Sequence, residues 1–511
     1  MTFRSILFEE SEERRSQEAL PVPEFFGDLN LDQIIDAITI GKEEYNLKPI
    51  FYSRLNEINA IKYRQDVMRD LDNKPHLDYV VSFAKKMRAI REHLAQAAKL
   101  HYKHQKNGWL FDALQIYCDA IIQLVQDLSQ VDLQSRGLRA FRDYLINYTE
   151  SEPFKSLLAE TIKLKADLST ITYCLLIKGD TAKVRKYESE IDYSSSVEQA
   201  FARFRQGAVK SYSVKFSNLP GMNHVEARIL DFVAQLYPEI FSTLERYCTQ
   251  HNDYLDETIG AFDREVQFYI SYLEYIARFK RMGLNFSYPQ IATNSKEVYN
   301  YEGFDIALAG ALISRDATIV CNDFHLKDGE RIMIVSGPNQ GGKTTFARTF
   351  GQLHFLASLG CPVPGKKARL FLFDKLFTQF EKEEQMKNLR GKLEDELVRF
   401  QRILHAMTPQ SIVIMNECFS STTLADAIFL SKRVMEKIVE KDLLCVCVTF
   451  IEELAKLGRT TVSMVSAVVP ENPALRTFKI VRRPADGLAY AVSIAEKYRL
   501  AYDCLKERIT S

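Results

Sequence analysis

The spacing of hydrophobic residues divides this chain into a helical first part and a mixed second part. Up to about residue 295, apolar residues recur with helical periodicity, and few glycines or prolines interrupt them. The longest such stretches are Leu77–Leu100, Leu114–Leu128 and Val225–Lys280. The pattern predicts a helix-rich domain over residues 1–295, because an apolar stripe on a helix is normally buried against other elements.

One strand-like island interrupts the helical part. Residues Thr170–Ile177 are apolar and β-branched, Lys178-Gly179-Asp180 is typical of a turn, and Thr181–Tyr187 continues with alternating polarity. We therefore predict a β-hairpin set between helices.

The hairpin and the residues after it carry many basic side chains among aromatic ones. Such a patch can contact nucleic-acid phosphates, and the alternative is an ordinary solvated face. The candidates on the hairpin are Lys178, Lys183, Arg185 and Lys186, and further basic residues follow at Arg203, Arg205, Lys210 and Lys215.

A loop-rich, polar and aromatic segment from Gly283 to Gly303 marks the main domain boundary. Beyond it, short apolar segments alternate with helical stretches, which predicts an α/β domain over residues 296–511. Strands are expected at Thr318–Cys321, Arg331–Ser336, Ser411–Met415, Leu443–Thr449, Val462–Val468 and Phe478–Val481.

A glycine-rich loop, residues 337–345, carries the strongest chemical signal of the chain. Its sequence GPNQGGKTT fits the phosphate-binding pattern G-x-x-x-x-G-K-[ST]. The apolar run Ile332–Val335 precedes it as a strand, and Phe346–Leu359 follows with helical spacing. A strand, a glycine-rich turn and a helix surround one anion with backbone N–H groups and the positive end of the helix.

The expected ligand of the glycine-rich loop is therefore a nucleoside triphosphate, and the alternative is a chance match in a glycine-rich turn. Lys343 would supply a positive charge to the outer phosphates, and the Thr344 hydroxyl would bind Mg²⁺. The other residues of the loop that we expect to contact the nucleotide are Gly337, Pro338, Asn339, Gly341, Gly342 and Thr345.

A second half of the site is expected at the end of a neighbouring buried strand. The apolar run Ser411–Met415 ends in Asn416-Glu417, about 75 residues after the glycine-rich loop. Glu417 is placed to act as a general base that accepts a proton from water. Asn416 is, after Thr344, the second candidate ligand of the metal, but it lacks the negative charge that Mg²⁺ prefers. An ordinary polar strand exit is the alternative.

Composition and charge narrow the class of protein. The 511 residues include 67 basic and 67 acidic side chains, so any binding of nucleic acid must come from local patches. No apolar stretch is long enough to span a bilayer, and the N-terminus is acidic where a signal peptide would be basic, so we expect a cytoplasmic protein without a membrane partner. The nine cysteines contain no C-x-x-C pair, and we expect them reduced and mostly buried.

Several blocks in order resemble the MutS mismatch-repair ATPases, which belong to the ABC class. The resemblance covers about Ala317–Arg508 and is specific, whereas Ile61–Gln65 and the hairpin match more weakly. The blocks are Thr318–Asp323, SGPNQGGKTT, Leu359–Pro364, Leu376–Thr378, IVIMNE and Ala485–Ala491.

This resemblance implies a multidomain α plus α/β fold. A helical core and lever arm with a clamp-like insertion at about 165–220 would be followed by an ABC-type P-loop ATPase domain. It implies ATP and Mg²⁺ as ligands, adds Asn322 to the nucleotide-binding candidates, and implies a homodimer that encloses duplex DNA under nucleotide control. A repair partner protein is a further expectation.

Three departures from the family concern the catalytic machinery. The family has Asp-Glu where this chain has Asn416-Glu417, and Thr-His where it has Thr449-Phe450. Its signature serine, which reaches the other subunit's nucleotide, falls on Gly391. Because Phe450 cannot hydrogen-bond a γ-phosphate, we expect ATP to bind while hydrolysis is slow or needs a partner.

The front of the chain also departs from the family, because core-like helices begin within the first few dozen residues. We therefore expect a shortened form without the N-terminal mismatch-reading domain, and shape-based or nonspecific duplex binding. The alternatives are a nonenzymatic, ATP-binding scaffold for protein partners and, less favoured because of the long helical part, the ATPase subunit of a transporter.

Overall fold

A computed structural model describes residues 3–9, 21–178, 181–189, 222–313, 315, 317–381, 391–469 and 472–484. The chain forms two compact units that interleave along the sequence. We call Met1–Phe3, Lys74–Leu133 and Arg139–Asp263 the helical unit, and Arg4–Asn73, Gln134–Leu138 and Arg264–Ser511 the sheet unit. The units do not coincide with a single division at residue 295, because the early helices up to Asn73 belong to the sheet unit.

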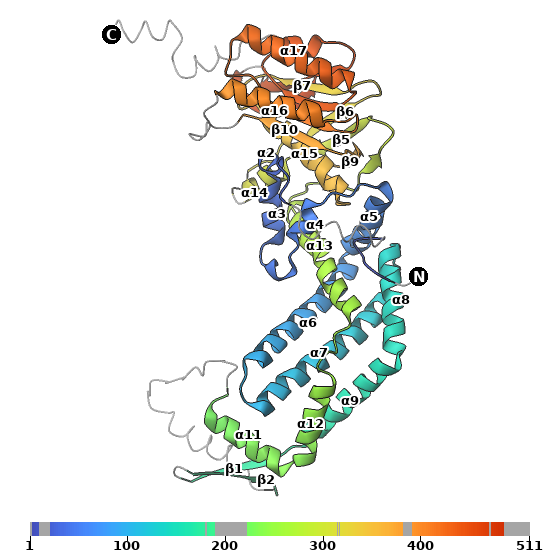
Figure 1. Cartoon of the computed structure of the whole chain (residues 1–511), viewed down its shortest axis with the longest axis vertical. Coiled ribbons are helices and arrows are strands. Elements are labelled where there is room, and N and C mark those ends of the chain that lie inside the picture. The colour runs from blue at the N-terminus through green and yellow to red at the C-terminus, as the bar shows by residue number, and fades with distance from the viewer. Residues whose placement is uncertain are drawn as a thin grey trace, which may run out of the picture. The chain divides into compact units, whose positions relative to one another are not determined.

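The helical unit is built from long helices, as the apolar periodicity predicts. The helices α6 and α7 run side by side, and the α7 residues Phe111, Leu114 and Cys118 pack with Leu157 of α9 and Tyr247 of α12 (Figure 1). The helices that lie largely in this unit are α6 Lys74–Lys99, α7 Lys103–Ser129, α8 Arg136–Glu150, α9 Glu152–Ser169, α11 His224–Leu236 and α12 Pro238–Gln250.

The long stretch Val225–Lys280 is divided into α11, α12 and α13 (Glu257–Lys280). Pro238 occupies the first position of α12, where its missing N–H costs nothing but where it cannot continue the preceding helix. Helical periodicity survives across such a break, which is why the stretch looks continuous in the sequence.

The predicted hairpin is present. Strand β1 (Tyr173–Lys178) pairs antiparallel with β2 (Thr181–Lys186), with Cys174 opposite Arg185 and Lys178 opposite Thr181. Its β2 strand lies against α11, where Val184 packs with the cluster around Val233. The clamp-like insertion of about 165–220 extends beyond residue 189 into residues that lie outside the described ranges.

The sheet unit contains a mainly parallel sheet. The described strands run in the order β10-β11-β12-β7-β13-β14, parallel except for the antiparallel β13–β14 pair. Strands β7 and β12 are buried along their whole length, as expected for parallel strands covered on both faces. The strands are β7 Ile332–Ser336, β10 Leu376–Phe380, β11 Ile412–Asn416, β12 Leu444–Val448, β13 Thr461–Val469 and β14 Asn472–Arg482.

A smaller sheet, in the order β4-β9-β5-β6, lies in the same unit. A further two-stranded pair joins β3 to β8. The strands are β3 Phe286–Ser287, β4 Gln290–Ala292, β5 Val298–Gly303, β6 Asn322–Leu326, β8 Val363–Pro364 and β9 Lys367–Phe371.

The remaining elements of the sheet unit are helical, and α15 is the next element after β7 in the chain. They are α2 Phe26–Leu29, α3 Leu31–Thr39, η1 Glu43–Tyr45, α4 Lys48–Tyr52, α5 Ile58–Asp72, most of α13, α14 Ile306–Ile313, α15 Lys343–Ser358, α16 Lys392–Ala406, α17 Leu424–Glu440 and η2 Glu452–Lys456.

Four of the six strand predictions in this region are confirmed within one residue, and the prediction at Phe478–Val481 covers only the last part of β14. The prediction at Thr318–Cys321 is wrong. Those residues have no regular structure, and the strand β6 begins at Asn322. The β6 sequence alternates polar residues with the buried Phe324 and Leu326, and Leu326 pairs with Val298 of β5. A β-branched run without a partner strand does not become a strand, because sheet propensity depends on pairing and burial.

Among the residues that the structure describes, no helix combines the length and the apolar character needed to cross a membrane.

Candidate nucleotide-binding site

The glycine-rich loop joins the end of β7 to the start of α15, as the sequence predicts. Gly337 and Gly342 adopt positive φ angles of 119° and 90°, a region that glycine enters without a steric penalty. A Cβ on Gly341 would lie 2.2 Å from Oγ of Ser466, whose hydroxyl donates to the Gly341 carbonyl at 2.7 Å. Ser466 on β13 therefore sets the shape of the loop, and its role was missed in the sequence because no motif marks it.

Lys343 is buried and folded back over the loop. Its Nζ donates to the carbonyl oxygens of Gly337 and Pro338, each at 3.1 Å, and to Oδ1 of Asn339 at 3.3 Å. Nζ also lies 3.7 Å from Oε1 of Glu417. Burial lowers the pKa of Lys343, and the Glu417 carboxylate opposes that shift. The ammonium group thus lies inside the cradle where an anion would bind.

Thr344 and Asn416 meet in the structure, although 72 residues separate them. The Thr344 hydroxyl donates to Oδ1 of Asn416 at 2.8 Å. Strand β12 lies between β11 and β7, and parallel pairing brings the carboxyl ends of these strands to one edge of the sheet. The predicted metal-side pair is therefore assembled, with an oxygen-only donor set that suits Mg²⁺ but brings no negative charge of its own.

Glu417 follows β11 with a left-handed backbone, φ 52°, and its N–H donates to the Val448 carbonyl of β12 at 2.9 Å. The side chain is about one-third exposed and faces the Lys343 ammonium group. This position leaves the carboxylate accessible to a water molecule.

Thr449 and Phe450 lie where β12 ends. Thr449 is buried, its N–H donates to the Val335 carbonyl, and its hydroxyl accepts the N–H of Ile451 at 3.0 Å. Phe450 is 54% exposed. The exposed position next to β7 thus carries an apolar ring that can neither donate nor accept a hydrogen bond.

Asn322 has a different contact from the one predicted. Its amide donates to the Phe478 carbonyl at 3.1 Å and accepts from the N–H of Ile480 at 2.7 Å, so it ties β6 to β14. Gly342 lies against the same Phe478 backbone, since a Cβ on this glycine would be 3.6 Å from the Phe478 oxygen. The Phe478 backbone therefore lies between Asn322 and the glycine-rich loop. Contact between Asn322 and a nucleotide stays a prediction.

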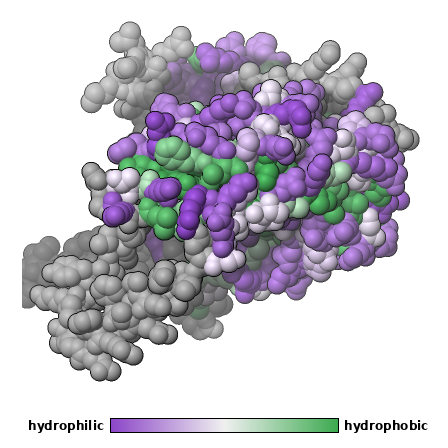
Figure 2. Space-filling view, turned by 90° about the horizontal axis from the view of Figure 1, so that it is seen from below, coloured by the Kyte–Doolittle hydropathy of each residue, from purple (hydrophilic) through white to green (hydrophobic). Residues whose placement is uncertain are grey.

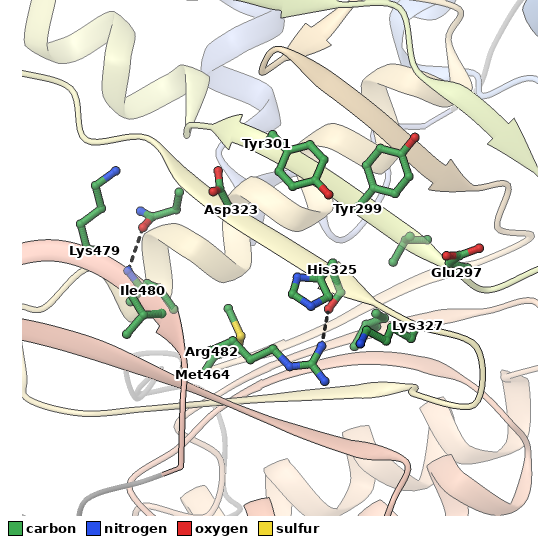
Figure 3. A pocket seen from close by; sticks show the side chains of 14 residues that line it. Glu297, Tyr299, Tyr301, Asp323, His325, Lys327, Met464, Lys479, Ile480 and Arg482 are labelled. Carbon is green, nitrogen blue, oxygen red and sulfur yellow. Dashed lines mark hydrogen bonds between the residues drawn. The ribbon is translucent and has the colours of Figure 1, made fainter.

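Asn322 and Ile480 also line a cavity of about 610 Å³ (Figure 3). Two β5 tyrosines, Tyr299 and Tyr301, line it together with His325 of β6 and Lys479 and Arg482 of β14. Burial and, to a smaller extent, the charge of Arg482 lower the pKa of His325. Both effects favour the neutral imidazole ring.

The family-like positions around the site have ordinary structural roles. Gly391 is the N-cap of α16, and none of the described residues lies within 4 Å of the place where its Cβ would be. Thr423, in the polar segment after Glu417, caps α17 by accepting the N–H of Asp426 at 3.3 Å. The block Ala485–Ala491 lies outside the described residues.

Within the described ranges, no three His, Cys, Asp or Glu side chains gather in a way that could hold a metal ion. A metal in this site would therefore be held through the Thr344 hydroxyl, the Asn416 amide oxygen and phosphate oxygens rather than by a protein cage.

The four basic hairpin candidates belong to the helical unit and do not share one face. Strand alternation and the β1–β2 register place Lys178, Lys183 and Arg185 on the face opposite Val184. Lys186 lies on the packed face, with its Nζ 5.1 Å from the centre of the Tyr237 ring. Viewed from below, this end of the helical unit mixes hydrophilic surface with hydrophobic patches (Figure 2).

Comparison with known proteins agrees with the blocks in the second half of the chain. Residues 333–507 match the family model described as MutS domain V. Similar proteins include the DNA mismatch repair protein MSH3 of Eremothecium gossypii, 30% identical over 146 residues, 28% of this chain and 14% of that protein. Endonuclease MutS2 of Gemmatimonas aurantiaca is 29% identical over 195 residues, 37% of this chain and 23% of that protein.

The longest of these matches is to the DNA mismatch repair protein MutS of Rickettsia typhi, 25% identical over 245 residues, 48% of this chain and 26% of that protein. The matched segments thus span only 14% to 26% of these relatives' length. Together with the strand, loop and helix described above, the matches support a MutS domain V in the C-terminal part of this chain, at residues 333–507.

Proposed function

We propose that this chain is a nucleotide-gated, DNA-binding protein of MutS type that binds ATP with Mg²⁺ at the glycine-rich loop. The observation that carries the proposal is the buried Lys343, whose Nζ is held by two loop carbonyls and lies 3.7 Å from Glu417. A buried ammonium group bonded mainly to neutral oxygens is under-compensated, so an arriving triphosphate would improve its environment.

Different residues around the glycine-rich loop would bind the nucleotide with its metal and promote its hydrolysis. Bound Mg²⁺ would neutralise the developing charge on the phosphates, and Thr344 and Asn416 would orient its shell. Glu417 would accept a proton from the attacking water. Because Asn416 is neutral and Phe450 offers no hydrogen bond, we expect binding to tolerate these two residues better than turnover does.

DNA is the proposed macromolecular partner. Lys178 and Lys183 are exposed and share one face of the hairpin with Arg185. Two exposed lysines on one face of a narrow hairpin suit the phosphates of a duplex backbone, and this arrangement predicts binding by charge rather than by base sequence.

A homodimer is the proposed assembly, on the resemblance to the family. The sheet unit exposes large apolar side chains that a second copy would cover, and Phe450, just after the end of β12, is one of them. The others include Leu397 on α16, and Leu424 and Phe429 on α17. Closure of two such faces around nucleotide would change the grip of the helical units on DNA.

The test is calorimetric titration of the protein with ATP and Mg²⁺, followed by binding to duplex, mismatched and branched DNA with and without nucleotide. Lys343→Ala should abolish the heat of ATP binding, whereas the exposed control Lys366→Ala should leave it unchanged. Absence of heat in the unmodified protein would refute nucleotide binding. Equal DNA binding by Lys343→Ala and the unmodified protein in all conditions would refute gating.

The second candidate function is an ATP-binding scaffold that no longer hydrolyses nucleotide. The neutral Asn416 and the apolar, exposed Phe450 favour it. Single-turnover hydrolysis by purified protein separates the two: phosphate release that Lys343→Ala abolishes favours the enzyme, and bound but uncleaved ATP favours the scaffold.

A further inference from the structure

The turn that carries Glu417 is held in an unfavourable backbone conformation. Glu417 and Phe419 have positive φ angles of 52° and 61°, and neither is glycine. Side chains with a Cβ rarely adopt this region, so the surrounding structure must hold the turn in place. The position of the Glu417 carboxylate therefore depends on what holds Phe419.

Helix α16 holds Phe419 through its backbone and through its ring. The Phe419 N–H donates to Oε2 of Glu396 at 3.0 Å. The Phe419 ring stacks on Phe400, with ring centres 5.0 Å apart and planes inclined by 28°. Glu396 and Phe400 lie four residues apart, one turn of the same helix, so a single face of α16 supplies both contacts.

This contact is buried from solvent. Phe419 is fully buried, and Glu396 and Phe400 are 5% and 3% exposed. A carboxyl group at such a depth is retained only with a partner, and the Phe419 N–H is the hydrogen-bond partner found for it among the described residues. Burial raises the pKa of Glu396, and this N–H acts in the opposite direction.

We propose that Glu396 is a positioning residue for hydrolysis: by accepting the Phe419 N–H, its carboxylate fixes the left-handed turn that directs Glu417 toward Lys343. The inference rests on the proposed function, since it assigns a role within the same site. It adds a residue on α16 that touches neither the glycine-rich loop nor Lys343, and it explains how a turn without glycines keeps this shape.

Three substitutions separate a hydrogen-bond acceptor from a packing group. Glu396→Gln keeps an oxygen that can accept the Phe419 N–H, whereas Glu396→Met fills a similar volume without an acceptor. Glu396→Asp keeps the charge but withdraws the carboxylate by one methylene, and it serves if Glu396→Met does not fold. Glu394→Met, at an exposed position of the same helix, is the matched control.

Two measurements on the full chain test the proposal. Hydrogen exchange over residues 416–423 should be faster in Glu396→Met and Glu396→Asp, and unchanged in Glu396→Gln and Glu394→Met. Single-turnover ATP hydrolysis should fall roughly tenfold or more in the first two variants, the size expected when a buried N–H loses its acceptor. The affinity for ATP should stay within about threefold in all four, which a general loss of structure would not allow.

The outcomes distinguish the inference from the proposed function. If Glu396→Met and Glu396→Asp match the unmodified protein in exchange and in hydrolysis, the role of Glu396 is refuted. Equal losses in Glu396→Gln and Glu396→Met would also refute it, because the acceptor would not be what matters. If the unmodified protein binds no ATP, the proposed function fails, and hydrogen exchange alone then decides whether Glu396 holds the turn.

Discussion

Removal of two hairpin lysines should weaken DNA binding in a way that can be worked out from the strand register. Lys178 pairs with Thr181, which places Lys178 on the same face as Lys183 and Arg185. Lys178 and Lys183 are exposed at this face. The double variant Lys178→Ala/Lys183→Ala therefore removes the two exposed lysines proposed to contact phosphates, and it leaves the packed face with Val184 unchanged.

The expected loss follows from counterion release. Each phosphate neutralised by a protein cation contributes about 0.9 to the slope of log K against log salt concentration on duplex DNA. Two lost contacts reduce the slope by about 1.8. Because this contribution vanishes near 1 M salt, the affinity at 0.1 M salt should fall by about 60-fold.

Fluorescence anisotropy with a labelled duplex, measured from about 0.05 to 0.3 M salt, gives both the affinity and the slope. Lys186→Ala should change neither by much, because Lys186 lies over Tyr237 on the other face. The variant Lys366→Ala/Lys367→Ala removes the same charge from exposed positions of the sheet unit and controls for net charge. A slope that is equal in the hairpin and control double variants would refute phosphate contact by this face.

Three further predictions concern the sheet unit. Burial lowers the pKa of His354 to about 4, below the usual 6.5, so the fold favours the neutral ring and the resulting stability is lost as pH falls from about 6.5 toward 4. Hydrogen exchange of α15 should show a loss of about 2 kcal/mol from pH 7 to pH 5 that His354→Leu lacks, and parallel curves would contradict this origin. Phe450→His supplies a hydrogen-bond donor at the end of β12 and should speed single-turnover hydrolysis roughly tenfold with little change in ATP affinity, whereas an unchanged rate would show that Phe450 is not limiting. Gly351→Ala would place a Cβ 2.6 and 2.8 Å from two buried side chains and should destabilise the protein by about 1–3 kcal/mol in urea unfolding, while Gly108→Ala, with open space around it, should not; equal stabilities would mean that the packing adjusts.

Elements whose signals are local could be predicted from the sequence. The strand β7, the glycine-rich loop and α15 follow one another within a few residues, and glycine positions and apolar spacing specify each of them. The sequence predicts the hairpin for the same reason, because its turn and its alternation lie within about fifteen residues. Backbone preferences and hydrogen bonds between residues close in sequence form these elements, and neither depends on distant parts of the chain.

Other features depend on partners far away in the sequence. The small sheet's β9 pairs with both β4 and β5, and β6 replaced the predicted strand at Thr318–Cys321 because pairing with β5 selects its register. A propensity pattern contains no information about which distant segment will supply the next strand.

The sequence alone determined which chemical groups this protein has at the candidate site: a lysine and a threonine in a phosphate-binding pattern, and a glutamate after a buried strand. Only the tertiary structure decided that Thr344 meets Asn416, that Glu396 accepts the Phe419 N–H, and which hairpin cations share a face. The physical reason is that residue type and local spacing fix the available chemistry, whereas strand order and helix packing, set by burial of the whole core, fix the distances between groups.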